Sequence, residues 1–193
     1  LPAYPTMAAV PDAVDLAIVA VPAPAVLAAL EDCAAHGVRG AVVLSAGFAE
    51  VGGPGVAWQE EMSALARRTG MRVVGPNCMG LINVRRRLLG TFTPSAAGFG
   101  LVPGRISVVS QSGAFGGYCL SLIRQRGLGL NLWITTGNQC DVDVADCIEH
   151  FALDAETQVI AGYLEAAADK ERLFHALALA RERGKRVVIM KVG

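Results

Sequence analysis

The sequence has no excess of either charge, few aromatic residues, and no apolar run long enough to span a bilayer. Lys plus Arg and Asp plus Glu each number 17, and aromatic residues make up 6%. A balanced charge offers no basic field for nucleic acid or for an acidic membrane surface. Charges or prolines interrupt every apolar stretch, and no signal peptide is recognisable. We therefore expect neither a nucleic-acid partner nor a membrane partner.

Paired cysteines are also missing. The five cysteines are an odd number and include no Cys-x-x-Cys pair, which argues against a secreted disulfide framework and favours the reducing cytoplasm. The histidines lie far from most cysteines, so there is no zinc spacing. Asp141, Asp143 and Asp146 do not complete an EF-hand loop. We interpret Asp143 as a helix cap and the other two as solvated, and we expect no metal site.

What the sequence does contain is a regular alternation of apolar runs and amphipathic segments. Hydrophobic residues make up 53% of the 193 residues, and there are 22 glycines. This composition and pattern are typical of an α/β protein with buried parallel strands. The predicted strands are 15–21, 41–45, 71–74, 106–110, 130–136, 159–164 and 187–190. The predicted helices are 24–36, 56–69, 113–126, 142–152 and 170–183.

Residues 76–104 interrupt this alternation. They are rich in Gly, Pro, Ser, Thr and Arg, and we place a domain junction near 92–103 within them. The sequence therefore predicts two parallel-sheet domains, over residues 1–95 and 96–193. Parallel sheets bind ligands beyond the carboxyl ends of their strands, so the chemistry is expected at those ends.

Small and polar residues follow several of the predicted strands. Ser110-Gln-Ser-Gly-Ala114 opens a helix, where free N–H groups and the positive helix end favour an anion. Ser112 is also a good N-cap residue, and the segment matches the nucleophile elbow only loosely. Asn77 and Cys78 follow another strand, and Cys78 is either a ligand neighbour or a small buried hydrophobe. Glu165 ends a strand as a salt-bridged carboxylate or as the orienting partner of a histidine.

In their order and spacing, these motifs resemble the NDP-forming acyl-CoA synthetases, the superfamily that includes the α subunit of succinyl-CoA synthetase. The resemblance covers essentially the whole chain and is closer to the ADP-forming acetyl-CoA synthetases. The motifs that carry it are Val21-Pro-Ala-Pro24, Ala46-Gly-Phe-Ala-Glu50, Gly75-Pro-Asn-Cys-Met-Gly-Leu81, Val109-Ser-Gln-Ser-Gly-Ala114, Gly137-Asn138, Asp154-Ala-Glu-Thr157, Tyr163-Leu-Glu165 and Val187-Val-Ile-Met-Lys-Val-Gly193.

The resemblance implies a partial Rossmann-like CoA-binding domain followed by a flavodoxin-like succinyl-CoA-ligase domain. It implies that an acid, CoA and ATP or GTP give acyl-CoA, ADP or GDP and phosphate, through an acyl phosphate and a phosphohistidine. Glu165 would orient that histidine, and Gly116 and Gly117 would help shape the acyl pocket. The phosphoryl-stabilising helix start would be Ser112, Gly113 and Ala114. The CoA-binding residues would be Val21, Pro22, Leu44, Ser45, Ala46, Asn77 and Cys78.

Three parts of the family pattern are not in the sequence: a glycine-rich phosphate loop, the tag of the phosphorylated histidine, and the nucleotide-binding ATP-grasp part. The glycine-rich phosphate loop would precede Leu1, and the tag of the phosphorylated histidine would follow Gly193. His36, His150 and His175 do not match that tag, and we interpret them as structural. The resemblance therefore implies that a partner ATP-grasp domain or subunit supplies the nucleotide site with Mg²⁺. It further implies an oligomer that acts on a small carboxylic acid, and it implies that this chain alone is incomplete.

Two other functions remain open at this stage. One is a regulatory acyl-CoA sensor, because related domains occur fused to protein acetyltransferases. The other is a serine hydrolase with Ser112 as nucleophile and Asp169 and His175 as partners. Asp169 and His175 lie only six residues apart on one predicted helix, which suits a triad poorly.

Overall fold

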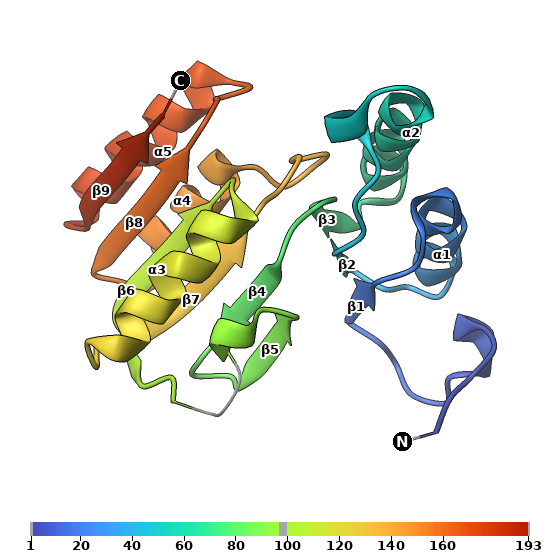
Figure 1. Cartoon of the computed structure of the whole chain (residues 1–193), viewed down its shortest axis with the longest axis horizontal. Coiled ribbons are helices and arrows are strands. Elements are labelled where there is room, and N and C mark those ends of the chain that lie inside the picture. Colours follow the sequence, from blue (N-terminus) through green and yellow to red (C-terminus); the bar gives the residue numbers. More distant parts are fainter. Residues whose placement is uncertain (1, 97–99, 193) are drawn as a thin grey trace.

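The computed structural model describes residues 2–96 and 100–192, and it has two α/β units side by side (Figure 1). The first unit has a three-stranded parallel sheet in the order β1 (Leu16–Val19), β2 (Gly40–Val43) and β3 (Arg72–Val74). Helices α1 (Ala23–Ala35) and α2 (Pro54–Thr69) connect these strands and lie on the same side of the sheet. The predicted strands and helices of this unit are thus present.

Prolines and glycines set the ends of the first two helices. α1 begins after Pro22, with a proline in its first turn, and α2 begins at Pro54 itself. Proline suits a first turn because its missing N–H has no partner there in any case. α2 ends at Thr69, and the left-handed φ of 75° at the following Gly70 lets the Gly70 N–H bond the carbonyl of Ala66. These signals explain why the predicted helix bounds lie close to the observed ones.

The second unit has a six-stranded sheet in the order β5 (Leu88–Thr91), β4 (Gly80–Asn83), β7, β6, β8 and β9. Its parallel strands are β6 (Pro103–Ser110), β7 (Leu130–Thr135), β8 (Val159–Leu164) and β9 (Arg186–Lys191). Helix α3 (Gly113–Gln125) covers one face of this sheet, and α4 (Val144–Leu153) and α5 (Lys170–Glu182) cover the other (Figure 1). Trp133 packs on the α3 side and Phe151 on the α4 side, so there is a core on each face.

A β-hairpin lies in the segment that interrupts the predicted alternation. Its strands are β4 (Gly80–Asn83) and β5 (Leu88–Thr91), and β4 also pairs antiparallel with β7. The hairpin therefore extends the second sheet, although it precedes the predicted junction near 92–103. Residues 97–99 of that junction lie outside the described part of the chain. The division at residue 95 stays a prediction.

The helices of the described residues are short. The longest of the five α-helices, α2, has 16 residues and carries charged side chains along its length. Among the described residues, no helix has both the length and the apolarity needed to cross a membrane.

Candidate functional site

A cavity of about 510 Å³ lies where the strand ends of the two units meet. Leu44 and Ala46 line it from the end of β2, and Asn77 and Cys78 line it from the loop after β3. The second unit adds the start of α3, Ser112, Gly113 and Ala114, and the residue after β8, Glu165. The structure thus brings together most of the residues singled out in the sequence, while their roles stay predictions.

The start of α3 forms one wall of this cavity. Ser112 is the N-cap, and its Oγ accepts a hydrogen bond from Phe115 N at 3.2 Å. The first N–H groups of an α-helix have no partner within the helix, and Gly113 and Ala114 hold this position beside the cavity. A Cβ on Gly113 would lie 2.8 Å from Met79 Cγ, so only glycine lets the helix start pack this closely. The wall therefore offers N–H groups and a positive helix end to an anion.

Glu165 reaches the same cavity because Gln111 holds the backbone beside it. Gln111 Nε2 donates to the carbonyl of Ala166 at 2.6 Å, and Gln111 Oε1 accepts from Ala166 N at 3.0 Å and from Glu165 N. The Gln111 side chain is buried, whereas Glu165 is exposed. Gln111 lines the cavity as well. Sequence reasoning missed its role, and its place between the two serines of a strand end is the signal that could have found it.

Cys78 contributes a protonated thiol. It is 2% exposed, and its Sγ donates to the carbonyl of Val43 at 3.4 Å. Burial raises the pKa of the Cys78 thiol to about 11. A thiol in this state is a poor nucleophile at neutral pH. Of the two interpretations left open for Cys78, the structure supports a small buried side chain that touches the cavity.

Glu50 and Asn138 are further cavity residues whose roles the sequence analysis did not identify. Glu50 Oε1 accepts from Gly47 N at 2.6 Å, both Glu50 oxygens lie 3.2 Å from Phe48 N, and Asn138 Nδ2 donates to Glu50 Oε2 at 2.5 Å. Burial alone would raise the pKa of Glu50, but the hydrogen bonds from Gly47, Asn138 and Phe48 outweigh it and hold the pKa below its ordinary value. Glu50 is therefore a carboxylate at neutral pH.

Some predicted residues do not line the cavity. Ser45 Oγ donates to the carbonyl of Val21 at 2.5 Å and so joins the segments that follow β1 and β2, and Pro22, next to Val21, precedes α1. Gly116 and Gly117 are buried in α3. A Cβ on Gly116 would lie 2.6 Å from Thr135 Cγ2, which gives this glycine a packing reason. A part in CoA or acyl binding stays a prediction for all five.

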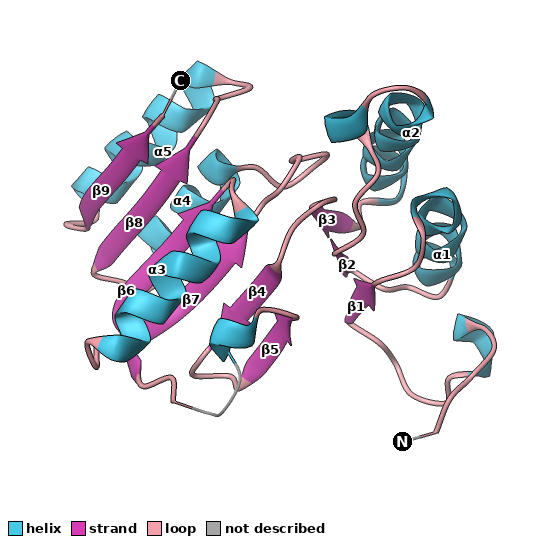
Figure 2. Cartoon of the chain, in the orientation of Figure 1, coloured by secondary structure: helices cyan, strands magenta, loops and turns pink. Residues whose placement is uncertain are grey.

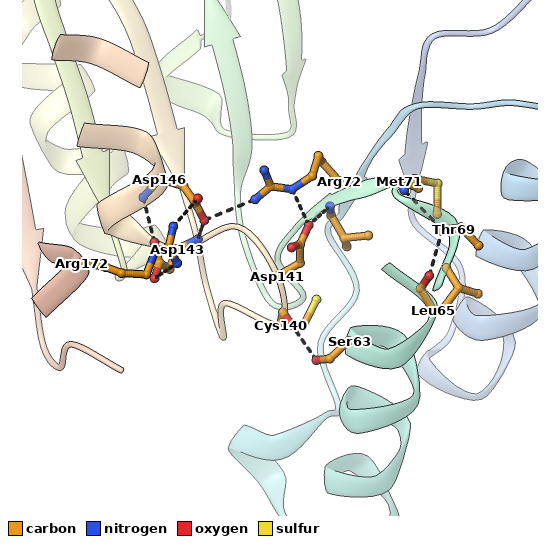
Figure 3. A network of polar contacts seen from close by, with 11 residues as sticks. Ser63, Leu65, Thr69, Met71, Arg72, Cys140, Asp141, Asp143, Asp146 and Arg172 are labelled. Carbon is orange, nitrogen blue, oxygen red and sulfur yellow. Dashed lines mark hydrogen bonds and ion pairs between the residues drawn. The ribbon is translucent and has the colours of Figure 1, made fainter. Parts of the chain in front are cut away.

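The aspartates after β7 differ in part from expectation. Asp143 caps α4 as predicted, and it shares a capping box with Asp146. Asp141 and Asp146 are not simply solvated: both pair with Arg72, and Asp146 also pairs with Arg172 (Figure 3). These basic partners could not be read from the local sequence. Among the described residues, no group of three or more His, Cys, Asp and Glu side chains is placed to hold a metal ion.

Two of the three side chains in the serine-hydrolase hypothesis cap helices in the structure. Ser112 Oγ caps α3, and Asp169 Oδ1 caps α5 by accepting from Arg172 N at 3.0 Å. His175 is exposed on α5. The capping bonds account for Ser112 and Asp169 without a catalytic triad.

Comparisons with known proteins agree with this two-unit architecture. The CoA binding domain model matches residues 1–84, and the succinyl-CoA ligase like flavodoxin domain model matches residues 103–193. These two matches define the chain as a CoA-binding unit joined to a ligase-type flavodoxin unit. The chain belongs to the NDP-forming acyl-CoA synthetase superfamily.

The relatives are longer than this chain. Acetate–CoA ligase (ADP-forming) I of Archaeoglobus fulgidus is 41% identical over 192 residues, which are 100% of this chain and 27% of the relative. Subunit alpha of acetate–CoA ligase (ADP-forming) II of Pyrococcus furiosus is 36% identical, over 99% of this chain and 40% of the subunit. The structure of acetyl-coenzyme A synthetase 1 of Candidatus Korarchaeum cryptofilum, in complex with phosphate and ADP, superposes with a TM-score of 0.92 at 34% identity, over 100% of this chain and 40% of that one.

Proposed function

We propose that this chain is the CoA-binding and phosphoryl-binding part of an NDP-forming acyl-CoA synthetase, which joins a small carboxylic acid to CoA at the expense of ATP or GTP. The observation that supports it is the meeting of the α3 start, Glu165 and the predicted CoA residues at one cavity of about 510 Å³. The relatives described above are named as CoA ligases, which favours a ligase over an acyl-CoA sensor.

The residues of the first unit fit the reactive end of CoA. Leu44 and Ala46 offer a narrow apolar wall, and Asn77 and Cys78 offer an uncharged amide and a protonated thiol. Pockets for small ligands combine apolar walls with a few polar groups in this way. When bound, CoA supplies the thiol that accepts the acyl group. The chain's own part is to hold that end beside the second unit.

The residues of the second unit fit a dianionic phosphoryl group and a histidine. N–H groups at the start of α3 stabilise negative charge without reacting themselves. The Glu165 carboxylate would accept a hydrogen bond from an imidazole and so hold its tautomer and orientation. His36, His150 and His175 do not line the cavity. The histidine is therefore proposed to come from outside this chain.

The complete enzyme requires parts beyond this chain. We infer an ATP-grasp domain or subunit that binds ATP or GTP with Mg²⁺, and an oligomeric assembly. The domain division at residues 1–95 and 96–193 is proposed for this part of it. The five cysteines are free, which suits a cytoplasmic enzyme.

Calorimetric titration of the 193-residue chain with CoA tests the proposal. We expect saturable binding by the wild type and a loss of at least tenfold in CoA affinity for Ala46→Trp. The indole would project from the cavity wall into the space proposed for CoA. Ala57→Trp, on the exposed side of α2, is the matched control and should bind normally. No CoA binding by the wild type would overturn the proposal.

A further inference from the structure

The loop between β7 and α4 fastens the two units together. Figure 2 shows it leaving the second sheet toward the first unit. Within residues 136–143, backbone N–H groups of Asn138, Cys140 and Val142 donate to the carbonyls of Pro76, Gly75 and Val73 at 2.9–3.0 Å. Ser63 Oγ of α2 donates to the carbonyl of Cys140 at 2.7 Å (Figure 3). The loop thus runs along the segment that ends β3 and enters the cavity.

The Asn138 side chain adds hydrogen bonds between the loop and side chains of the first unit. Its Nδ2 donates to Glu50 Oε2 at 2.5 Å and to Gln59 Oε1 at 2.9 Å, and its Oδ1 accepts from Asn77 Nδ2 at 3.2 Å. A primary amide has two donor hydrogens, and both are used by the first unit. Asn138 therefore has no remaining donor for a ligand, although it lines the cavity.

The glycine before Asn138 lets the loop come this close. Gly137 has a left-handed φ of 55°, and a Cβ there would lie 2.2 Å from the carbonyl oxygen of Pro76. A side chain at this position would push the loop away from the first unit. The close approach of Asn138 is thus built into the backbone.

The partners of Asn138 are themselves parts of the cavity wall. Glu50 and Asn77 line the cavity. The Glu50 carboxylate also accepts from the N–H groups of Gly47 and Phe48 and so closes the turn that follows Ala46. A displacement of Asn138 would remove one of the hydrogen bonds that hold the Glu50 carboxylate and would so loosen the turn. The position of the first unit's wall therefore depends on a side chain of the second unit.

We propose that Asn138 is a positioning residue that sets the CoA-binding wall at residues 46–50 through Glu50 and Asn77, an inference that rests on the proposed function. The neutral amide of Asn138 is essential because it donates to the Glu50 carboxylate and also accepts from the Asn77 amide. An aspartate has no donor, so Asn138→Asp would place a second negative charge against Glu50.

The experiment compares wild type, Asn138→Asp and the double variant Glu50→Gln/Asn138→Asp at pH 8. Hydrogen exchange reports the amides of Gly47 and Phe48, and calorimetry reports CoA affinity. We expect Asn138→Asp to speed exchange of these amides about tenfold and to weaken CoA about tenfold, the equivalent of about 1.4 kcal/mol. In the double variant the introduced glutamine amide can donate to the introduced carboxylate, so both values should return toward wild type.

Asn83→Asp is the matched control, because Asn83 Oδ1 accepts from Arg86 N in the remote hairpin turn and an aspartate can do the same. It should change neither readout. Unchanged exchange and affinity in Asn138→Asp, or no recovery in the double variant, would overturn the inference. If Asn138→Asp does not fold, Asn138→Ser must show the same change in smaller measure. If the wild type binds no CoA, the proposed function fails, and the exchange data decide the inference on their own.

Discussion

Single residues at the cavity gain their roles from partners distant in sequence. Gln111 follows β6, yet its amide holds the backbone of Glu165 and Ala166 after β8. Asn138 likewise holds Glu50, which precedes it by 88 residues. A sequence shows the residue type and its place at a strand end, but not which side chain will arrive opposite. This is why Glu165 and Ser112 could be proposed as site residues while Glu50 could not, and why the sequence showed the place of Gln111 at a strand end but not its partners.

Cys78 gives a prediction about stability at high pH. Its folded pKa is about 11, above the ordinary value of 9.0. The unfolded thiol therefore ionises first, so the stability held by the buried neutral thiol is present below pH 9 and is lost as the pH rises toward 11. We expect Cys78→Ser to reduce the fall in unfolding free energy between pH 9 and 10.5, by up to about 1.4 kcal/mol per pH unit.

Urea unfolding at several pH values measures this difference. Serine is the suitable replacement because its hydroxyl can still donate to the carbonyl of Val43. Cys119 is half-buried rather than buried, so Cys119→Ser is the control and should change the slope less. Parallel curves for the wild type and Cys78→Ser would show that the thiol is not buried in its neutral form.

The secondary-structure elements were largely predictable, with one exception. The parallel strands and the five α-helices of the described residues follow from apolar runs bounded by prolines, glycines and caps, such as Gly70 after α2 and Asp143 before α4. The β4–β5 hairpin escaped because each of its strands has only two apolar residues beside Gly, Asn or Thr, and its turn carries three arginines. Its pairing with β7 is a tertiary contact, and a short, half-buried strand shows no local sign of such a partner.

Helix α3 gives a prediction from two adjacent glycines. A Cβ on Gly116 would lie 2.6 Å from Thr135 Cγ2, whereas one on Gly117 would meet Thr93 Oγ1 at 3.5 Å, an ordinary contact distance. Gly116→Ala should therefore destabilise the protein by about 1–3 kcal/mol through overpacking. Gly117→Ala should be neutral or stabilise it by about 0.5–1 kcal/mol, because alanine favours a helix interior over glycine.

Chemical denaturation of the two variants tests the packing role of Gly116. The variants share the helix, the burial and the added methyl group, so any general effect of alanine on α3 cancels. Equal stability changes would mean that α3 does not sit on β7 as closely as the structure shows. A loss of stability confined to Gly116→Ala would confirm the packing role without bearing on acyl binding.

The two units are held together by charge as well as by the loop after β7. Arg72 of β3 lies with its Nε 3.0 Å from Asp141 Oδ2 and its Nη2 3.3 Å from Asp146 Oδ2 (Figure 3). Burial would raise the pKa of Asp146, but the N–H of Asp143 and the guanidinium of Arg172 outweigh it, with Arg72 helping to lower the pKa. The Asp146 pairs therefore persist at neutral pH and are lost in acid, as the Asp146 carboxylate takes up a proton.

Arg72→Gln tests how much this network joins the units. Arg72 is 55% exposed but its carboxylate partners are only 19–20% exposed, so the loss should exceed that of a surface pair and reach about 1 kcal/mol. Arg39→Gln is the matched control, because Arg39 and Asp15 are 82% and 79% exposed and such a pair contributes about 0–1 kcal/mol.

Urea unfolding should show the larger loss for Arg72→Gln at pH 7, and a smaller difference from wild type at pH 3. Salt screens exposed charges more than half-buried ones. In 1 M NaCl, the stability loss of Arg39→Gln should therefore shrink by a larger fraction than that of Arg72→Gln. Equal effects of the two substitutions under all three conditions would mean that the network does not join the units.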